Sequence, residues 1–227
     1  MRVNHLILKK WISPEVVTYA FAKEFGEEGL SWLDSDGSEQ GRFSILGCKP
    51  KKLITCRNLS NRSSANNPFK RLREIKTGYW MGWLSYEAGS WIEPSNLWHE
   101  SDMATLWIAS YDPIIKFDLL NKKIIIEGTH FSELKKYKKI IENINLKEFK
   151  IKSYNNLEFN FSNINLEKTG KQFKENILRI KKLIAIGDIF QANLAVKCVL
   201  NSLKKHKYLD IYSKIRREIK SPFGGII

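Results

Sequence analysis

The stretch that decides the fold is Gly187-Asp188-Ile189-Phe190-Gln191-Ala192-Asn193-Leu194, where the pattern changes from helical to alternating. Upstream of it, Thr169 and Gln172 have the spacing of a capping box, in which each side chain bonds the other residue's backbone N–H. The apolar residues that follow share one helical stripe, at Phe173, Ile177, Ile180 and Ile184. We therefore expect a helix that begins at Thr169 and ends at Gly187, since glycine commonly terminates helices.

Beyond Gly187, apolar and more polar residues alternate. This pattern predicts a half-buried strand whose apolar positions are Phe190, Ala192, Leu194, Val196 and Cys198. Gln191 and Asn193 then share the opposite face of the strand. Two amides on one face can donate hydrogen bonds to a carboxylate or tie the strand to a neighbouring loop, and the residues leave both roles open.

Outward from this segment, helices are mixed with many short strands that read as antiparallel, so the predicted fold class is α+β. Ser13-Pro14 begins a helix that Gly26 ends, and two further helices are expected over 132–144 and 208–219. A turn-rich stretch follows Gly26, and 57–69 is expected to be a polar surface loop. Predicted strands cover 3–11, 43–46, 53–56, 79–86, 104–110, a hairpin of 114–120 with 123–126, and the apolar end of the chain at 223–227.

Composition and charge exclude several classes of protein. The 227 residues are 43% hydrophobic and carry a net charge of +14, of which +13 lies in residues 116–227. Twenty-nine of the 38 basic residues are Lys, the usual solvated charge, which argues against nucleic-acid recognition by Arg forks. The sequence offers neither a membrane-spanning run nor a leader, so a cytoplasmic location is expected. Three unclustered cysteines argue against a disulfide framework and a zinc site.

The usual catalytic motifs are absent from the sequence. There is no glycine-rich nucleotide loop, no HExxH and no GxSxG, and the four histidines are scattered. His99, Glu100 and Asp102 form a local group of metal-ligand types, but such a group is more often part of a surface loop. The chemistry of the residues alone therefore discloses no reaction.

Four blocks, in order, resemble the chorismate-utilising enzymes, meaning component I of aminodeoxychorismate synthase (para-aminobenzoate synthase) and of anthranilate synthase. The segment from Gly187 to Leu194 is similar to their "GDIFQVNL" motif through Gly187, Asp188, Gln191 and Asn193. The other blocks are Leu33-Asp34-Ser35 with 41–47, 82–89 with Glu93, and Ser221-Pro222-Phe223-Gly224. Asn193 favours the aminodeoxychorismate enzymes, because the anthranilate enzymes usually carry Val there. Ser90 departs from the family, which commonly has Arg, so no charge role is assigned to it.

The resemblance implies two domains and a specific reaction. Residues 1–150 would form the anthranilate synthase component I-like N-terminal domain, and 165–227 would begin the chorismate-binding domain. The family uses Mg²⁺ and ammonia from a glutamine amidotransferase subunit. The aminodeoxychorismate enzyme aminates chorismate at C4 to 4-amino-4-deoxychorismate, toward p-aminobenzoate and folate. The anthranilate enzyme aminates C2 and eliminates pyruvate, toward tryptophan.

The family's Mg²⁺-binding glutamates and its "PIKGT" lysine segment do not occur in this sequence, so we assign no catalytic or metal residue to it. We expect the N-terminal half of a longer or split protein, or a truncated remnant, inactive alone. The alternatives are anthranilate synthase component I, a non-catalytic fragment or assembly scaffold that folds on a separate C-terminal half, and a lysine-rich nucleic-acid binder.

One ligand site of the family falls within this half, a pocket for L-tryptophan. Residue by residue it corresponds to Ser35, Gln40, Gly41, Arg42, Phe43, Pro222, Phe223 and Gly224. Arg42 would face the carboxylate of the ligand, and Phe43 and Phe223 would sandwich the indole. In the alternative, the two phenylalanines are core strand residues and Arg42 is a surface charge.

Overall fold

A computed structural model describes residues 3–57, 59, 62–95, 98–100, 102–147, 159–160, 166–196, 201–202 and 207–227. The chain divides into two compact units, one of residues 1–152 with 212–227 and one of residues 153–211. The first unit holds two antiparallel sheets and their helices, which confirms the α+β prediction.

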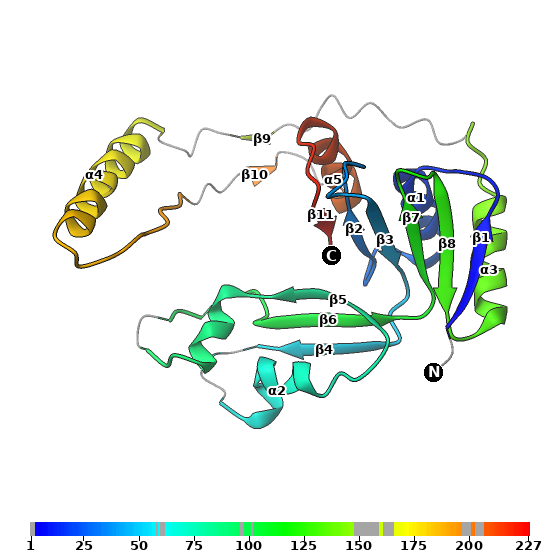
Figure 1. The fold of residues 1–227 in the computed structure, drawn as a ribbon, viewed down its shortest axis with the longest axis horizontal. Helices are drawn as coiled ribbons and strands as arrows, with labels where there is room; N and C mark the ends of the chain where they lie inside the picture. The colour runs from blue at the N-terminus through cyan, green and yellow to red at the C-terminus, as the bar shows by residue number, and fades with distance from the viewer. Residues whose placement is uncertain are drawn as a thin grey trace. The chain divides into compact units, whose positions relative to one another are not determined.

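A six-stranded antiparallel sheet organises the first unit, with strand order β1-β8-β7-β3-β2-β11 (Figure 1). Its strands are β1 (Asn4–Leu8), β2 (Ser31–Asp34), β3 (Phe43–Gly47), β7 (Ile114–Asp118), β8 (Lys123–Gly128) and β11 (Gly224–Ile226). The hairpin β7–β8 pairs Asp118 with Lys123, as predicted. Because side chains alternate between the faces of a strand, Ile115, Phe117 and Ile126 fall on one face and are fully buried.

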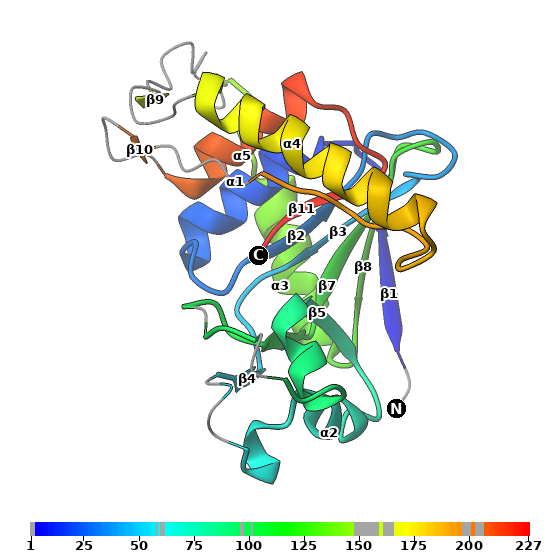
Figure 2. The same ribbon diagram turned by 90° about the vertical axis from the view of Figure 1, so that its left-hand side faces the viewer.

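Two helices cover that buried face. Helix α1 (Pro14–Phe25) contacts β3, and α3 (Phe131–Glu142) contacts β1, β8 and α1 (Figure 2). The predicted caps of α1 are confirmed, since the Ser13 hydroxyl accepts from the Val16 backbone and Gly26 ends the helix at a φ of 89°. Phe21 of α1 packs edge-on against Tyr137 of α3, with 5.0 Å between the ring centroids.

A three-stranded sheet of order β4-β6-β5 completes the first unit. It consists of β4 (Lys52–Cys56), β5 (Tyr79–Leu84) and β6 (Leu106–Tyr111). Its core of Ile54, Cys56, Leu106 and Ile108 is covered by Leu72, Ile75 and Trp80. Leu72 belongs to α2 (Pro68–Arg73), and a 3-10 helix, η1 (Ser64–Asn66), precedes it. The predicted loop over 57–69 is therefore wrong at its end, because Asn67 caps α2 and Pro68 is its first residue.

Two elements beside the end of the chain position the candidate site. Helix α5 (Tyr208–Glu218) agrees with the predicted helix, and its residues from Tyr212 onward belong to the first unit. Strand β11 pairs with β2, so the predicted terminal strand is confirmed. Strand β2 lies inside the stretch expected to be turns. It is a strand because it is bonded on both sides, by β3 and β11, while the Trp32 indole donates to the Ser44 hydroxyl at 2.8 Å.

The second unit contains α4 (Leu166–Ala185) and a short antiparallel pair, β9 (Phe159–Asn160) with β10 (Asn201–Ser202). The predicted helix is confirmed, but its start is wrong, because Thr169 lies within the first turn and is not the cap. Gly187 does end the helical region, at a φ of 82°, while the Asp188 backbone bonds Leu183.

The predicted strand after Gly187 is wrong over 190–196, where the chain has no regular secondary structure and Phe190 is 92% exposed. Cys198 lies outside the described residues. An alternating pattern becomes a strand only where a neighbouring strand supplies hydrogen bonds, and none lies beside this segment in the described part of the chain.

Candidate functional site

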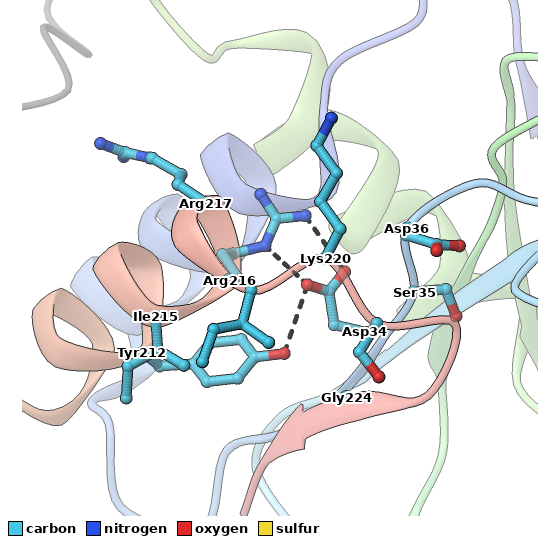
Figure 3. Close-up of a pocket in the computed structure, with 11 residues that line it drawn as sticks. Asp34, Ser35, Asp36, Tyr212, Ile215, Arg216, Arg217, Lys220 and Gly224 are labelled. Carbon is cyan, nitrogen blue, oxygen red and sulfur yellow. Dashed lines mark hydrogen bonds and ion pairs between the residues drawn. The ribbon is translucent and has the colours of Figure 1, made fainter.

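A cavity of about 430 Å³ lies in the first unit, where α5 and β11 meet the end of β2 (Figure 3). Three segments supply its lining, one after β2, one along α5 and one through the turn into β11. Its lining residues are Asp34, Ser35, Asp36, Tyr212, Ile215, Arg216, Arg217, Ile219, Lys220, Ser221 and Gly224. Carboxylates, cations and an aromatic ring therefore face one cavity.

The Asp34 carboxylate is the most heavily bonded group in the cavity. It ends β2, is 5% exposed, and accepts from Arg216 Nε at 2.6 Å and from the Tyr212 hydroxyl at 3.3 Å. Figure 3 shows both side chains pointing from α5 toward this carboxylate. Burial alone would lower the pKa of Arg216, but its bond to Asp34 and the charges of Asp34 and Glu15 raise it, so the guanidinium stays charged. Burial, followed by the Asp34 charge, raises the pKa of Tyr212.

A second carboxylate, Glu15 at the start of α1, anchors the other side of α5. It is 6% exposed and accepts from Arg217 at 2.7 Å and from the Ser213 hydroxyl. Its other oxygen lies 3.6 Å from Arg216, which joins the two carboxylates into one network. Two buried carboxylates are thus compensated by two arginines, which fixes α5 against α1 and β2.

The rim of the cavity is formed by two turns. The Asp36 carboxylate accepts from the Ser38 backbone at 2.9 Å, and hydrogen bonds from Ser38 lower the pKa of Asp36. In the other turn the Ser221 hydroxyl and Phe223 bond each other. Gly41 allows the two turns to approach each other closely, since a Cβ on residue 41 would lie 2.8 Å from the Pro222 backbone.

The eight residues predicted for a tryptophan pocket divide into two groups. Ser35 and Gly224 line the cavity, Gly41 packs on Pro222 at its rim, and Gln40 is exposed in the adjoining turn. Ser35 donates its hydroxyl proton to the Phe43 carbonyl at 2.5 Å. Two of the segments that the resemblance indicated thus contribute to the cavity, and the third segment of its lining, from Tyr212 to Lys220, was not indicated by it.

The remaining members of the set do not line this cavity. The Arg42 guanidinium binds the Asp118 carboxylate with both Nε and Nη2, the latter at 2.6 Å, and lies 4.8 Å above the Phe43 ring. This bond is the main reason that the pKa of Asp118 is lowered. Lys116 also lies over Phe43, at 4.3 Å. Phe43 is 38% exposed and Phe223 76% exposed. The roles of these residues toward tryptophan stay predictions.

Sequence reasoning missed the central groups of the cavity, namely Asp34, Tyr212 and Arg216. Asp34 stands in the quoted Leu33-Asp34-Ser35 block, next to the predicted Ser35. Tyr212 and Arg216 are four residues apart on the predicted helix and therefore share a face. That spacing, together with the resemblance of the neighbouring segments, is the signal that could have found them.

The motif residues that follow α4 belong to the second unit. Gly187 ends the helical region, the Asp188 backbone closes its last turn, and the Gln191 and Asn193 side chains are exposed. In the part of the chain that the structure describes, no group of three His, Cys, Asp or Glu residues is arranged to hold a metal, His99, Glu100 and Asp102 included. We therefore place no Mg²⁺ ligand there.

Comparison with known proteins decides the family. The model of the chorismate binding enzyme family matches residues 31–227. The chain belongs to this family. The resemblance found in the four sequence blocks is thereby confirmed at the level of the family.

One relative is a protein of Synechocystis sp. described as "Anthranilate synthase component I-like protein". It is 22% identical over 234 residues, which cover 90% of this chain and 46% of that protein. The chain therefore spans about half the length of the curated relative it matches. Within the described residues, every helix is too short or too polar to cross a membrane.

Proposed function

We propose that the chain is the N-terminal part of a cytoplasmic aminodeoxychorismate synthase component I. The whole enzyme would aminate chorismate at C4 to 4-amino-4-deoxychorismate, with ammonia from a glutamine amidotransferase subunit, toward p-aminobenzoate and folate. The observation that carries this choice is Asn193 within the block from Gly187 to Leu194, together with the family match over residues 31–227. We propose the domain division 1–150 and 165–227 on the same resemblance.

The chain would form the N-terminal domain and the beginning of the chorismate-binding domain, and it would be inactive alone. The share of the relative that this chain covers, 46% of its length, supports this proposal. The Mg²⁺ of the family would be held by residues outside this chain.

A reconstitution experiment tests this proposal. The DNA directly downstream of the Ile227 codon is sequenced, the polypeptide encoded there is purified together with this chain, and chorismate consumption is measured with ammonium and Mg²⁺. We expect 4-amino-4-deoxychorismate from the pair and no turnover by this chain alone. Turnover of chorismate by the chain alone would contradict the proposal that it is inactive without the second polypeptide. No turnover by the pair would favour a non-catalytic scaffold.

Anthranilate synthase component I is the second candidate, because the Synechocystis relative carries that description. The product decides between the two enzymes, since 2-aminobenzoate is fluorescent and carries its amino group at a different ring position. Formation of 2-aminobenzoate by the reconstituted pair would replace the first proposal with the second.

We further propose that the cavity beside β2 binds L-tryptophan. Of the lining residues outside the Asp34 and Glu15 network, Asp36 supplies negative charge for an ammonium group and Lys220 supplies positive charge for a carboxylate. Binding to the folded state raises the melting temperature, so L-tryptophan should stabilise the intact chain. Indole-3-propionate, which lacks the ammonium group, is the matched control ligand. An equal shift with both ligands, or no shift with either at millimolar concentration, would contradict the proposal.

A further inference from the structure

The charges of this chain are strongly segregated. Residues 77–115 contain no Lys or Arg and five acidic residues, whereas all 38 basic residues lie elsewhere in the sequence. The same stretch holds five of the seven tryptophans. A basic protein thus contains one region that is acidic and rich in aromatic side chains.

Several aromatic rings of the first unit carry a cation from the same chain, and among the four exposed rings of its described residues (Phe43, Tyr86, Phe131 and Phe223) Phe43 and Phe131 do so. Lys116 lies 4.3 Å from the Phe43 ring centroid, and Lys122 lies 5.1 Å from that of Trp11. The other rings with such a partner are Phe25, Trp32, Trp91 and Phe131. Tyr86 and Trp98 pack on each other with 5.5 Å between centroids, and among the described residues no Lys or Arg lies over either ring.

This ring pair belongs to the 3-10 helix η2 (Tyr86–Trp91), which follows β5 at one end of the three-stranded sheet (Figure 1). In a 3-10 helix, side chains three apart line up, so Tyr86 and Gly89 share a face that Ile92 continues. Tyr86 is 86% and Ile92 67% exposed, whereas Ala88, on another face, is 1% exposed. The Trp98 ring packs on Gly89, where a Cβ would lie 2.9 Å from it. We call Tyr86, Gly89, Ile92 and Trp98, with the adjacent Glu87 and Glu93, the η2 patch.

Hydrogen bonding beneath the η2 patch is incomplete. Four buried side-chain polar atoms in the described part of the chain are without a hydrogen-bond partner, and three of them are Ser85 Oγ, Ser90 Oγ and Trp91 Nε1. Buried polar atoms of folded proteins nearly always have partners. These three atoms lie within seven residues beneath the patch, and because they are buried they are not themselves contacts for a partner.

We propose that the η2 patch is a docking surface for a basic segment of another protein. A Lys or Arg of that segment would lie over the Tyr86 and Trp98 rings and pair with Glu87 or Glu93, while an apolar residue covers Ile92. Glu87 and Glu93 attract a basic segment and repel phosphate groups, while Arg62, which donates to the Ser90 carbonyl, lies over Trp91 and not over Tyr86 or Trp98. This inference is independent of the reaction and the tryptophan cavity proposed above.

Binding of a defined probe to the full chain tests the proposal. The probe is a short fluorescent amphipathic helix of Lys and Leu, and its counterpart carries Glu in place of Lys. Because the chain is strongly positive overall, nonspecific attraction favours the Glu peptide. We expect the Lys peptide to bind at physiological salt, and Ile92→Ser or Tyr86→Ala to weaken it at least about tenfold. Tyr86→Phe, which keeps the ring, should bind as the parent does.

Matched control variants distinguish binding at the η2 patch from nonspecific electrostatic attraction to the chain. Ile7→Ser removes an equally exposed isoleucine from β1 and should leave binding unchanged. Glu87→Lys should abolish binding, whereas Glu39→Lys, the same change in charge on another exposed turn, should not. Unchanged circular dichroism shows that the variants fold. If Tyr86→Ala does not fold, the binding of the Tyr86→Phe and Ile92→Ser variants decides the outcome. Equal binding of the Lys peptide by all variants, or self-association that depends on Tyr86 and Ile92, would overturn the proposal.

Discussion

The cavity beside β2 and the η2 patch, both in the first unit, differ in how their acidic side chains are paired. In the cavity, Asp34 and Glu15 are buried and each is bonded to an arginine of α5. In the η2 patch, acidic and aromatic side chains stand in a stretch of sequence without any Lys or Arg. Carboxylates that are paired with arginines of the same chain hold the fold together. Carboxylates and aromatic rings without such a cation can instead contact the cation of another protein.

The largest expected effect tests the completeness of the cavity network. Asp34→Ala leaves the half-buried Arg216 guanidinium without its main partner, which we expect to lower the free energy of unfolding by about 3 kcal/mol. Arg71→Ala is the control, because its ion pair with Glu74 is exposed and is worth less than about 1 kcal/mol. Urea unfolding of both variants measures the difference. Equal losses would mean that the network adds nothing beyond a surface ion pair.

A glycine tests whether the two turns at the rim must touch. Gly41→Ala places a Cβ within 2.8 Å of the Pro222 backbone, and such overpacking should cost about 1–3 kcal/mol. Gly170→Ala provides a contrast of opposite sign, because the added Cβ meets nothing within 4 Å in α4 and alanine favours helix by about 0.5–1 kcal/mol. Melting temperatures that move in the same direction for both variants would contradict the close contact.

The ion pair of Arg42 with Asp118 predicts a pH dependence. The bond to Arg42 lowers the pKa of Asp118 in the folded protein below its ordinary value of 3.8. Its contribution to stability is therefore present above that value and is lost as the pH falls below it. Asp118→Asn should flatten this part of the stability curve and leave the curve near neutral pH parallel to that of the parent. Unfolding midpoints between about pH 2 and 7 measure it, and parallel curves throughout would contradict the assignment.

The smallest effect is expected in the η2 patch itself. Tyr86 and Ile92 are exposed, so Ile92→Ser should change the free energy of unfolding by no more than about 0.5 kcal/mol, even though we expect it to weaken binding of the basic peptide. Thermal melts of the isolated chain check this. A loss of stability as large as that of Gly41→Ala would mean that the η2 patch is part of the core. It would contradict the distinction between a stabilising network in the cavity and an exposed patch at η2.

The parts predicted correctly from the sequence are those whose signals are local. The Ser13 cap, the Gly26 terminator, the hairpin β7–β8 and the stripe of α5 are each specified by residues a few positions apart. The two errors about strands share a cause. Strand β2 exists because β3 and β11 bond it from both sides, and the pattern after Gly187 forms no strand because no neighbouring strand is present in the described part of the chain.

The candidate site follows the same rule. Motif resemblance indicated Ser35 and Gly224, which the pairing of β2 with β11 brings to one cavity. It assigned Arg42 to the carboxylate of a ligand, whereas in the structure Arg42 binds Asp118. The sequence by itself determined the family, both caps of α1 and the segregation of charge, because these are encoded in residue order and short-range spacing. Only the tertiary structure decided that Arg216 compensates Asp34 across 182 positions and that Tyr86 and Ile92 stay uncovered. Both depend on which distant surfaces meet, and no local pattern specifies that.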